Sequence, residues 1–409
     1  MTHRIAVGGY TDALTVLSFS AHEKKLVPAS AIGSTNASWL VPHPSAKDVW
    51  FTTSEVDPGF VRVLQFEGLE GKVLNEVATG GVHPTHIALT PDGKELFVAN
   101  YSSGDVSVLP VLAQAPYLGA PSQPLIAFAY TSPAPGEPQA AFNPGRQESS
   151  HPHQVLPLEN EVLVPDLGSD KVWRLHKTDG QWAVAGFIPF PRGSGPRHAL
   201  VLGDKLYTLC ELSLQLAVHT LRPLTESAEH IASLPTLETE TAPKKKKKGV
   251  LLPSAIAFTS SLPPTPAPEE TDAANKDLAQ PIEPEGVSEP PPPPLAAEIL
   301  APPPLTEDNG VQYIYVSNRN EPSPLGDSIA VFTPHPDFKL VRRVHTGVQH
   351  LRGLNFSPGG AKFLALAGQN GGGVKIFERL PGGYLKELDG ASVQEGEGGI
   401  TKTTSVTWL

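Results

Sequence analysis

The sequence has little of several residue types, and each scarcity excludes a class of protein. Cys210 is the only cysteine in 409 residues, so a disulfide framework is excluded and a reducing compartment is the simplest environment. No apolar run approaches the length that a membrane helix needs, and the N-terminal residues lack the apolar core and cleavage site of a signal peptide. We therefore expect a soluble, cytoplasmic protein that does not bind membranes.

Basic residues are also in deficit, because 31 Lys and Arg residues face 42 Asp and Glu residues and leave a net charge of −11. This balance argues against nucleic acid as a partner. It is compatible with a small anionic ligand, since a local cluster of Arg and His can override the global charge. The chain also lacks a Gly-x-Ser-x-Gly elbow, a compact metal motif and a nucleotide-phosphate loop. We expect no covalent nucleophile, no metal and no cofactor.

One pattern recurs along most of the chain. A short apolar strand starts after His, Ser or Arg, a turn follows, and a second strand ends in a small polar or acidic residue. Strand-length runs dominate, and no segment has a helical apolar period over three turns. Repeats of this kind predict an all-β protein, a β-propeller with four-stranded antiparallel blades. Clear copies cover residues 86–111, 153–175, 198–221 and 352–378, and weaker copies start near Ser38 and Ser254.

Six internal copies and two unpaired chain ends predict the number of blades. Residues 4–20 resemble the later strands of a copy, and residues 405–409 form a strand with no repeat of its own. Pairing the two ends into one blade would close the ring and cover both exposed edges. We therefore predict seven blades in a single domain over residues 1–409, with six or eight blades as the alternatives.

Two insertions interrupt the repeat. Residues 113–150 are rich in Pro, Ala and Gly and are predicted to form a long loop. Residues 235–309 contain a lysine run at 244–248 and proline-rich stretches, a composition that cannot bury enough apolar area to offset the entropy of ordering. We expect most of this insertion to be a disordered linker, with a short strand at 253–259 and renewed order near 296–300. Nuclear import or contacts with protein partners are its alternative roles.

Polar residues that flank the first two strands of each copy are expected to meet. Adjacent strands in a blade are antiparallel, so the residues before the first strand and those ending the second lie on one face, near the mouth of the channel. Clustered ionisable groups in a cleft are typical of a functional site. The candidates before first strands are His83, His86, His151, His153, Arg197, His198 and Arg352. Those at the ends of second strands are Asn100, Tyr101, Asp166, Glu211, Asn318, Arg319 and Gln369.

Some of these residues have a purely structural alternative. Asn100 and Asp166 belong to residue types that cap backbone amides at strand ends, and His86 could pack between blades. Two guanidiniums and a carboxylate are costly to gather unless an anion binds there, which favours a functional role for Arg197, Glu211 and Arg319. A calcium site is the alternative for the oxygen-bearing set Glu211, Asp166, Asn100 and Asn318.

Four motifs carry a resemblance to a known family: HPTHIALTPDGKELFVANYSSGDVSV, SSHPHQVLP, GSGPRHALV and YIYVSNRN. They resemble the seven-bladed β-propeller lactonases, which include propeller-type 6-phosphogluconolactonases and fungal 3-carboxy-cis,cis-muconate cyclases. The C-terminal SVTWL is similar to the fungal branch, whereas Arg352 is displaced from the family's Pro-Arg pair. The resemblance implies a cofactor-free enzyme whose partner is a small anionic lactone or muconate.

The resemblance also implies residue roles. The family's catalytic His maps onto His153, with His151 a near rival, and its Arg, Glu and second Arg map onto Arg197, Glu211 and Arg319. In hydrolysis, His153 or Glu211 would activate water, Arg197 would stabilise the oxyanion, and Arg319 would hold a remote phosphate or carboxylate. In cyclisation, the arginines would bind muconate carboxylates, and His153 or Glu211 would protonate carbon. The remaining candidates would contact substrate: His86, Asn100, His151, Asp166, His198 and Gln369.

A lactonase acting on a sugar-acid lactone is the leading prediction. A muconate cyclase uses the same residues and is the first alternative. A non-enzymatic propeller that recruits proteins is the second, although the chain lacks the GH and WD dipeptides of WD repeats.

Overall fold

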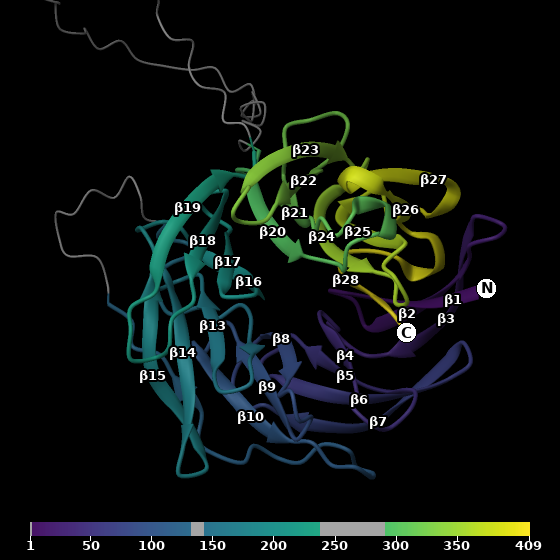
Figure 1. Ribbon diagram of the computed structural model, residues 1–409. Coiled ribbons are helices and arrows are strands. Elements are labelled where there is room, and N and C mark those ends of the chain that lie inside the picture. Colours follow the sequence, from purple (N-terminus) through teal and green to yellow (C-terminus); the bar gives the residue numbers. More distant parts are fainter. Residues whose placement is uncertain (1, 132–142, 238–290) are drawn as a thin grey trace, which may run out of the picture. The chain divides into compact units, whose positions relative to one another are not determined.

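The computed structural model describes residues 2–131, 143–237 and 291–409. It divides the chain into two units, Met1–Leu237 with Pro292–Leu409, and Glu238–Pro291. The second unit lies almost entirely outside the described residues. Within the described part, the first unit consists of seven four-stranded antiparallel sheets arranged as blades of a ring (Figure 1). The predicted all-β, seven-bladed propeller is confirmed.

The strands of each blade follow one another from the channel outward. The blade that closes the ring contains β28 (Thr403–Trp408), β1 (Thr2–Gly9), β2 (Ala13–Ser20) and β3 (Lys25–Gly33). The next contains β4 (Leu40–Pro42), β5 (Val49–Ser54), β6 (Phe60–Glu67) and β7 (Glu70–Ala78). It is followed by β8 (Pro84–Leu89), β9 (Glu95–Asn100), β10 (Asp105–Pro110) and β11 (Ile126–Ala127). The fourth contains β12 (Leu156–Pro157), β13 (Val162–Asp166), β14 (Lys171–Thr178) and β15 (Gln181–Pro189).

The other three blades complete the circuit. The fifth contains β16 (Pro196–Leu202), β17 (Lys205–Cys210), β18 (Gln215–Thr220) and β19 (Glu229–Pro235). The sixth contains β20 (Leu295–Leu300), β21 (Ile314–Arg319), β22 (Ser328–Thr333) and β23 (Lys339–His345). The seventh contains β24 (Gln349–Phe356), β25 (Phe363–Gly371), β26 (Val374–Leu380) and β27 (Tyr384–Val393). The 3-10 turns η2 (Thr306–Asp308), η3 (Pro381–Gly383) and η4 (Glu397–Gly399) lie in connections. No helix in the described ranges is long and apolar enough to cross a bilayer.

Pairing of the chain ends closes the ring, as the sequence predicts. β28 runs antiparallel to β1, with Ile5 opposite Trp408 and Val7 opposite Val406. These side chains join an apolar cluster with Phe19 and residues of β25 and β26. The last strand therefore covers the inner edge of β1 and packs against the seventh blade.

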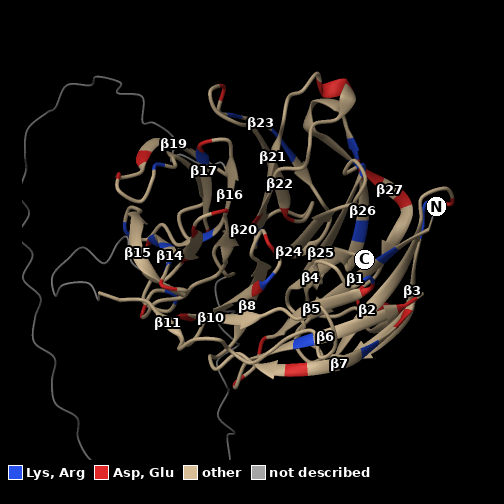
Figure 2. Ribbon diagram, turned by 60° about the horizontal axis from the view of Figure 1, so that its bottom comes forward, with Lys and Arg blue, Asp and Glu red and all other residues tan. Residues whose placement is uncertain are grey.

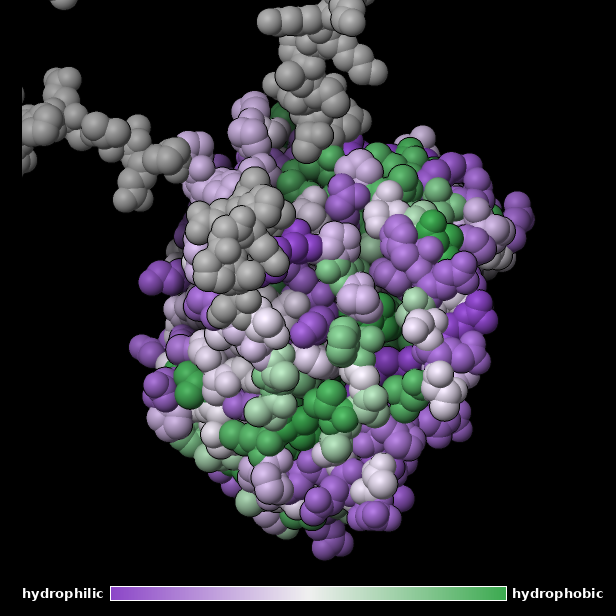
Figure 3. Space-filling view, turned by 90° about the vertical axis from the view of Figure 1, so that its left-hand side faces the viewer, coloured by the Kyte–Doolittle hydropathy of each residue, from purple (hydrophilic) through white to green (hydrophobic). Residues whose placement is uncertain are grey.

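Middle strands are buried on both faces, whereas outer strands alternate. β9 has five buried residues in six, because the blades on either side cover it, while β7 has only exposed and half-buried positions. Figure 3 shows the resulting surface on the side of β14 and β15, hydrophilic with hydrophobic stretches. On β15, Phe187 is 51% exposed, and the ammonium of Lys171 lies 4.9 Å from its ring centroid.

The two predicted insertions contain strands that complete blades. β11 lies inside the predicted loop 113–150 and pairs with β10 through Asp105 and Val106. β20 lies where renewed order near 296–300 is predicted. β20 pairs with one edge of β21, and β22 pairs with the other. The first strand of the copy predicted to begin near Ser254 is therefore β20. The strand predicted at 253–259 lies outside the described residues.

Candidate active site

Strand ends from several blades bring charged side chains to the channel. Arg197 lies at the start of the inner strand β16, and Glu211 directly follows β17, the second strand of the same blade. In the next blade, Glu298 lies in β20 and Arg319 ends β21. Figure 2 shows that acidic and basic residues also occur towards the middle of the ring, among the inner strands, and not only at its periphery.

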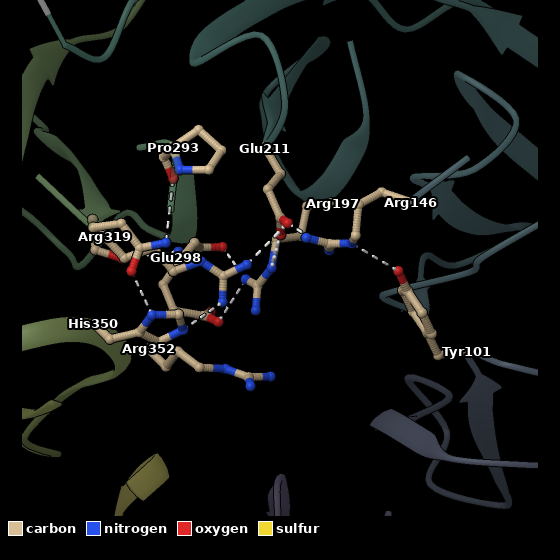
Figure 4. A network of polar contacts seen from close by, with 12 residues as sticks. Tyr101, Arg146, Arg197, Glu211, Pro293, Glu298, Arg319, His350 and Arg352 are labelled. Atoms are coloured by element: carbon tan, nitrogen blue, oxygen red, sulfur yellow. Dashed lines mark hydrogen bonds and ion pairs between the residues drawn. The ribbon is translucent and has the colours of Figure 1, made fainter. Parts of the chain in front are cut away.

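Glu211 is the centre of a buried ion-pair network (Figure 4). Its Oε1 lies 2.6 Å from Arg146 Nη2 and 2.9 Å from Arg319 Nη2, and its Oε2 lies 2.9 Å from Arg197 Nε. The Glu211 side chain is completely buried. Burial raises the pKa of this carboxyl group, but Arg319, Arg146 and Arg197 outweigh it and lower the pKa to about 2. Glu211 is therefore an anion at every physiological pH, held by three guanidiniums.

A second carboxylate adjoins this centre. Glu298 Oε1 lies 2.9 Å from Arg197 Nη1, and its Oε2 lies 2.9 Å from His198 Nδ1. Arg197 Nη1 also donates a hydrogen bond to the carbonyl of Ala297. Burial raises the pKa of the Glu298 carboxyl group, but the larger opposing effect of His198 and Arg197 lowers it below its ordinary value. Two carboxylates thus hold Arg197 in a fixed position.

One of the three guanidiniums comes from the Pro-rich segment 113–150, which follows β10 of the third blade. Arg146 lies just beyond the undescribed residues 132–142, within the predicted insertion 113–150. Besides Glu211, it contacts the hydroxyl of Tyr101, to which its Nε donates at 3.4 Å. The attraction of Glu211 outweighs burial and raises the pKa of Arg146 above its ordinary value. A segment predicted as a loop therefore supplies part of the site.

A cavity of about 310 Å³ opens beside this network. That volume suits a small ligand. The cavity is markedly cationic, since three of the lining residues are arginines and one is a carboxylate. The residues that line it are Tyr10, Glu55, Thr85, Tyr101, Arg146, His153, Leu295, Arg319, His350 and Arg352.

The two histidines in the cavity wall are held in their neutral form. Burial, followed by the charge of Arg197, lowers the pKa of His153 well below 6.5. Burial and the charge of Arg319 lower the pKa of His350 to about 3. His153 Nδ1 is buried and has no hydrogen-bond partner among the described residues, while its ring lies edge-on to Tyr101 and His198. The neutral imidazole of His153 keeps an unprotonated ring nitrogen that can accept a proton, although burial and the nearby guanidiniums weaken it as a base.

Arg352 is the third arginine that lines the cavity, and it is held by Tyr10 and Gln369. Its Nη1 donates to the hydroxyl of Tyr10 at 2.9 Å and to Oε1 of Gln369 at 3.1 Å. The Tyr10 hydroxyl in turn donates to Glu55 Oε1 at 2.9 Å. Burial lowers the pKa of Arg352, but Tyr10 and Glu55 outweigh it and raise the pKa. Gln369 thus contacts the site through Arg352.

Of the four residues predicted to be catalytic, two line the cavity. His153 and Arg319 do so, whereas Arg197 and Glu211 are not among the lining residues. Glu211 contacts Arg319 and Arg146 of the wall, and Arg197 contacts Glu211. The structure thus brings all four together in one cluster. It does not give Arg197 or Glu211 a surface on the cavity.

The residues predicted to bind substrate lie outside the cavity wall. Asn100 donates to Asp105 and Ser107, and His151 stacks on Tyr101 and contacts Glu148. The ring of His86 packs against Trp39 in a tilted arrangement, at 4.3 Å between ring centroids, and His198 contacts Glu298. Asp166 caps its strand end by accepting from Ser150 Oγ, Trp173 Nε1 and the backbone amides of His151, Gly168 and Ser169.

The calcium alternative does not fit these contacts. Asp166 uses its oxygens on amides, a hydroxyl and an indole, and Glu211 uses its oxygens on guanidiniums. Asn318 Nδ2 donates to the carbonyl of Thr236 at 3.2 Å, within another blade. The described residues contain no group of three or more His, Cys, Asp or Glu side chains that could hold a metal ion.

Several residues of the site were not among the sequence candidates. Arg146 and Glu298 lie in or beside the proline-rich insertions, where no repeat position marks them. Tyr10 and Glu55 directly follow the second strands β1 and β5, as Glu211 follows β17. This shared repeat position is the signal that could have identified Tyr10 and Glu55.

Comparison with known proteins agrees with this architecture. The sequence matches the family described as lactonase, 7-bladed beta-propeller, over residues 4–261 and 304–399. The chain belongs to this family of seven-bladed propeller lactonases. A 6-phosphogluconolactonase of Bacillus subtilis is 32% identical over 201 residues, which cover 47% of this chain and 54% of the relative. The chain thus spans about half the length of the curated relatives it matches.

Solved structures of proteins from other organisms share the fold. A periplasmic gluconolactonase of Pseudomonas aeruginosa has a TM-score of 0.70 and 22% sequence identity, with 100% of this chain and 99% of that chain covered. A protein from Lactobacillus plantarum has a TM-score of 0.71 and 22% identity, with complete coverage of both chains. At this identity, the likeness of the two structures supports the fold and assigns no activity.

Proposed function

We propose that this chain is a lactonase that hydrolyses an anionic sugar-acid lactone, with 6-phosphogluconolactone as the first candidate. The observation that carries the proposal is the cavity, where Arg146, Arg319 and Arg352 lie in the same wall as a neutral His153. Guanidiniums bind phosphate and carboxylate bidentately. The named activity of the Bacillus subtilis relative and the membership in the lactonase family support the same reaction.

His153 is the general base of the proposed reaction. Its imidazole accepts a proton from water as the water oxygen bonds to the lactone carbonyl carbon, and the carbonyl electrons move to oxygen. Collapse of this tetrahedral intermediate breaks the ring ester bond, and the departing alkoxide takes the proton back from the imidazolium. Neighbouring guanidiniums stabilise the transient oxyanion.

Arg197 and Glu211 act as positioning residues in this proposal. Glu211 has a pKa of about 2 and three arginine partners, so it has little capacity to accept a proton near neutral pH. Arg197 is bound to Glu211 and Glu298 and is not among the residues that line the cavity. Oxyanion stabilisation therefore falls to Arg319 or Arg352, and the anionic group of the substrate binds the remaining arginines.

Turnover assays test the proposal directly. The purified full chain is incubated with freshly prepared 6-phosphogluconolactone, with gluconolactone and with 3-carboxy-cis,cis-muconate, and proton release or muconate absorbance is followed. We expect accelerated hydrolysis of the phosphorylated lactone over its spontaneous rate, with loss of roughly 10²- to 10⁴-fold in His153→Asn. Turnover of the muconate alone would assign the cyclase activity instead, and no turnover of any of the three would contradict an enzymatic role at this site.

A further inference from the structure

Two residues of the cavity wall, Glu55 and Thr85, have no role in the proposed hydrolysis. Glu55 follows β5 and Thr85 lies in β8, and both line the cavity. A backbone hydrogen bond of 3.1 Å from the His83 amide to the Val56 carbonyl joins the two segments. The two side chains therefore come from adjacent blades and belong to one stretch of wall.

Both side chains carry an oxygen that the protein leaves unpaired. Glu55 Oε2 and Thr85 Oγ1 are buried and have no hydrogen-bond partner among the described residues. A buried polar oxygen without a partner costs free energy that a ligand donor can recover. Two such oxygens in one cavity wall point to a ligand that carries hydroxyl groups.

Glu55 is held firmly enough to select a ligand. Its Oε1 accepts a hydrogen bond from the Tyr10 hydroxyl at 2.9 Å, and that hydroxyl accepts one from Arg352. The backbone amide of Glu55 donates to the Asn36 carbonyl at 3.0 Å, and its carbonyl accepts from Asn36 Nδ2 at 3.0 Å. Both ends of the residue are therefore fixed, and little ordering remains to be done when a ligand binds.

We propose that Glu55 and Thr85 form a hydroxyl-recognition wall that selects polyhydroxylated lactones, an inference that rests on the proposed lactonase function. A carboxylate accepts hydrogen bonds from ligand hydroxyl groups, and a threonine hydroxyl can donate or accept. The same carboxylate repels a second carboxylate placed against it. The wall therefore favours a ligand with at most one carboxylate, such as a phosphorylated sugar acid or its lactone, over a polycarboxylate, while the arginines hold the phosphate.

Calorimetric titration separates this wall from the arginines. The probes are inorganic phosphate, which tests the arginines alone, and 6-phosphogluconate, the hydroxylated acid product. We expect Glu55→Gln to weaken binding of 6-phosphogluconate by about 10- to 100-fold and Thr85→Val to weaken it by about 3- to 10-fold. Binding of phosphate should change by less than about threefold in both variants. Glu76→Gln, which removes an outer-strand partner of Arg62, is the matched control and should bind both probes as wild type does.

The outcomes distinguish this inference from the function on which it rests. Unchanged binding of 6-phosphogluconate in both variants, in a wild type that hydrolyses lactones, overturns the wall and leaves the lactonase intact. Equal weakening of both probes overturns it as well, since Glu55 would then act only through Arg352. A wild type that binds phosphate but neither binds 6-phosphogluconate nor hydrolyses lactones removes the lactonase proposal and the wall with it. Thr85→Val leaves the charge unchanged and keeps the test valid if Glu55→Gln fails to fold.

Discussion

Replacing Glu211 with Gln should destabilise the propeller and not merely slow its chemistry. The carboxylate lies within 2.6 to 2.9 Å of Arg146, Arg197 and Arg319, and the last two are buried. Removing one partner of a buried ion pair typically costs about 3–5 kcal/mol, because the remaining charge loses its compensation. For a domain of this size, we expect the unfolding midpoint to fall by roughly 5–10 °C.

Turnover should fall in the same variant because the arginines lose their anchor. Displacement of positioning groups by about 1 Å typically costs roughly 10²-fold in rate, so we expect a loss of that order in kcat/KM. Phosphate should raise the unfolding midpoint of the variant more than that of wild type, since it replaces the missing anion. The measurements are thermal unfolding by circular dichroism, with and without phosphate, and lactone hydrolysis.

A matched control is Glu161→Gln, which breaks a partly buried bidentate pair with Arg174, neither of which lines the cavity. It should lower the unfolding midpoint and leave kcat/KM within about twofold of wild type. A Glu211→Gln protein that unfolds at the wild-type temperature but has lost turnover would refute the reasoning. Glu211 would then be a proton-transfer group, the alternative role that the family resemblance implies.

The same geometry leads to three more expectations. Arg146→Gln should lower kcat/KM by about 10- to 100-fold through loss of a charge-assisted contact, whereas the exposed control Arg222→Gln should not. Truncation after Lys402 removes β28 and exposes the inner edge of β1. The midpoint of thermal unfolding should therefore fall by more than about 10 °C, or the protein should aggregate. Burial lowers the pKa of His153 well below 6.5, so kcat/KM should stay level as pH falls through 6.5 and decline only at lower pH. Because the unfolded chain protonates this histidine near pH 6.5 and the folded chain does not, the free energy of unfolding should also fall as pH drops below 6.5, which urea titrations can measure.

The sequence was sufficient to predict the fold, because two separate features indicate it. Each copy alternates buried strands with turn residues, which predicts the blades, and the unmatched C-terminal strand predicts the closure by β28. The inner strand of the sixth blade was harder to place. A proline-rich insertion separates β20 from the preceding blade, so the pattern near Ser254 gave a plausible but incorrect start.

The candidate site was predictable where repeat positions are strong. His153, Arg197, Glu211 and Arg319 flank well-formed strands, and the structure places them in one cluster. Strand order could not show which of them reach the cavity, because that depends on side-chain direction and on which groups pair with each other. Arg146 was missed since its position in a long loop has no periodicity.

The most direct test is a crystal structure of the full chain with 6-phosphogluconate. We predict that its phosphate lies between guanidiniums of the cavity, within about 3 Å of Arg319 or Arg352, and that its carboxylate lies beside His153. A product bound away from the channel, or bound there with no arginine in contact, would contradict the proposed active site.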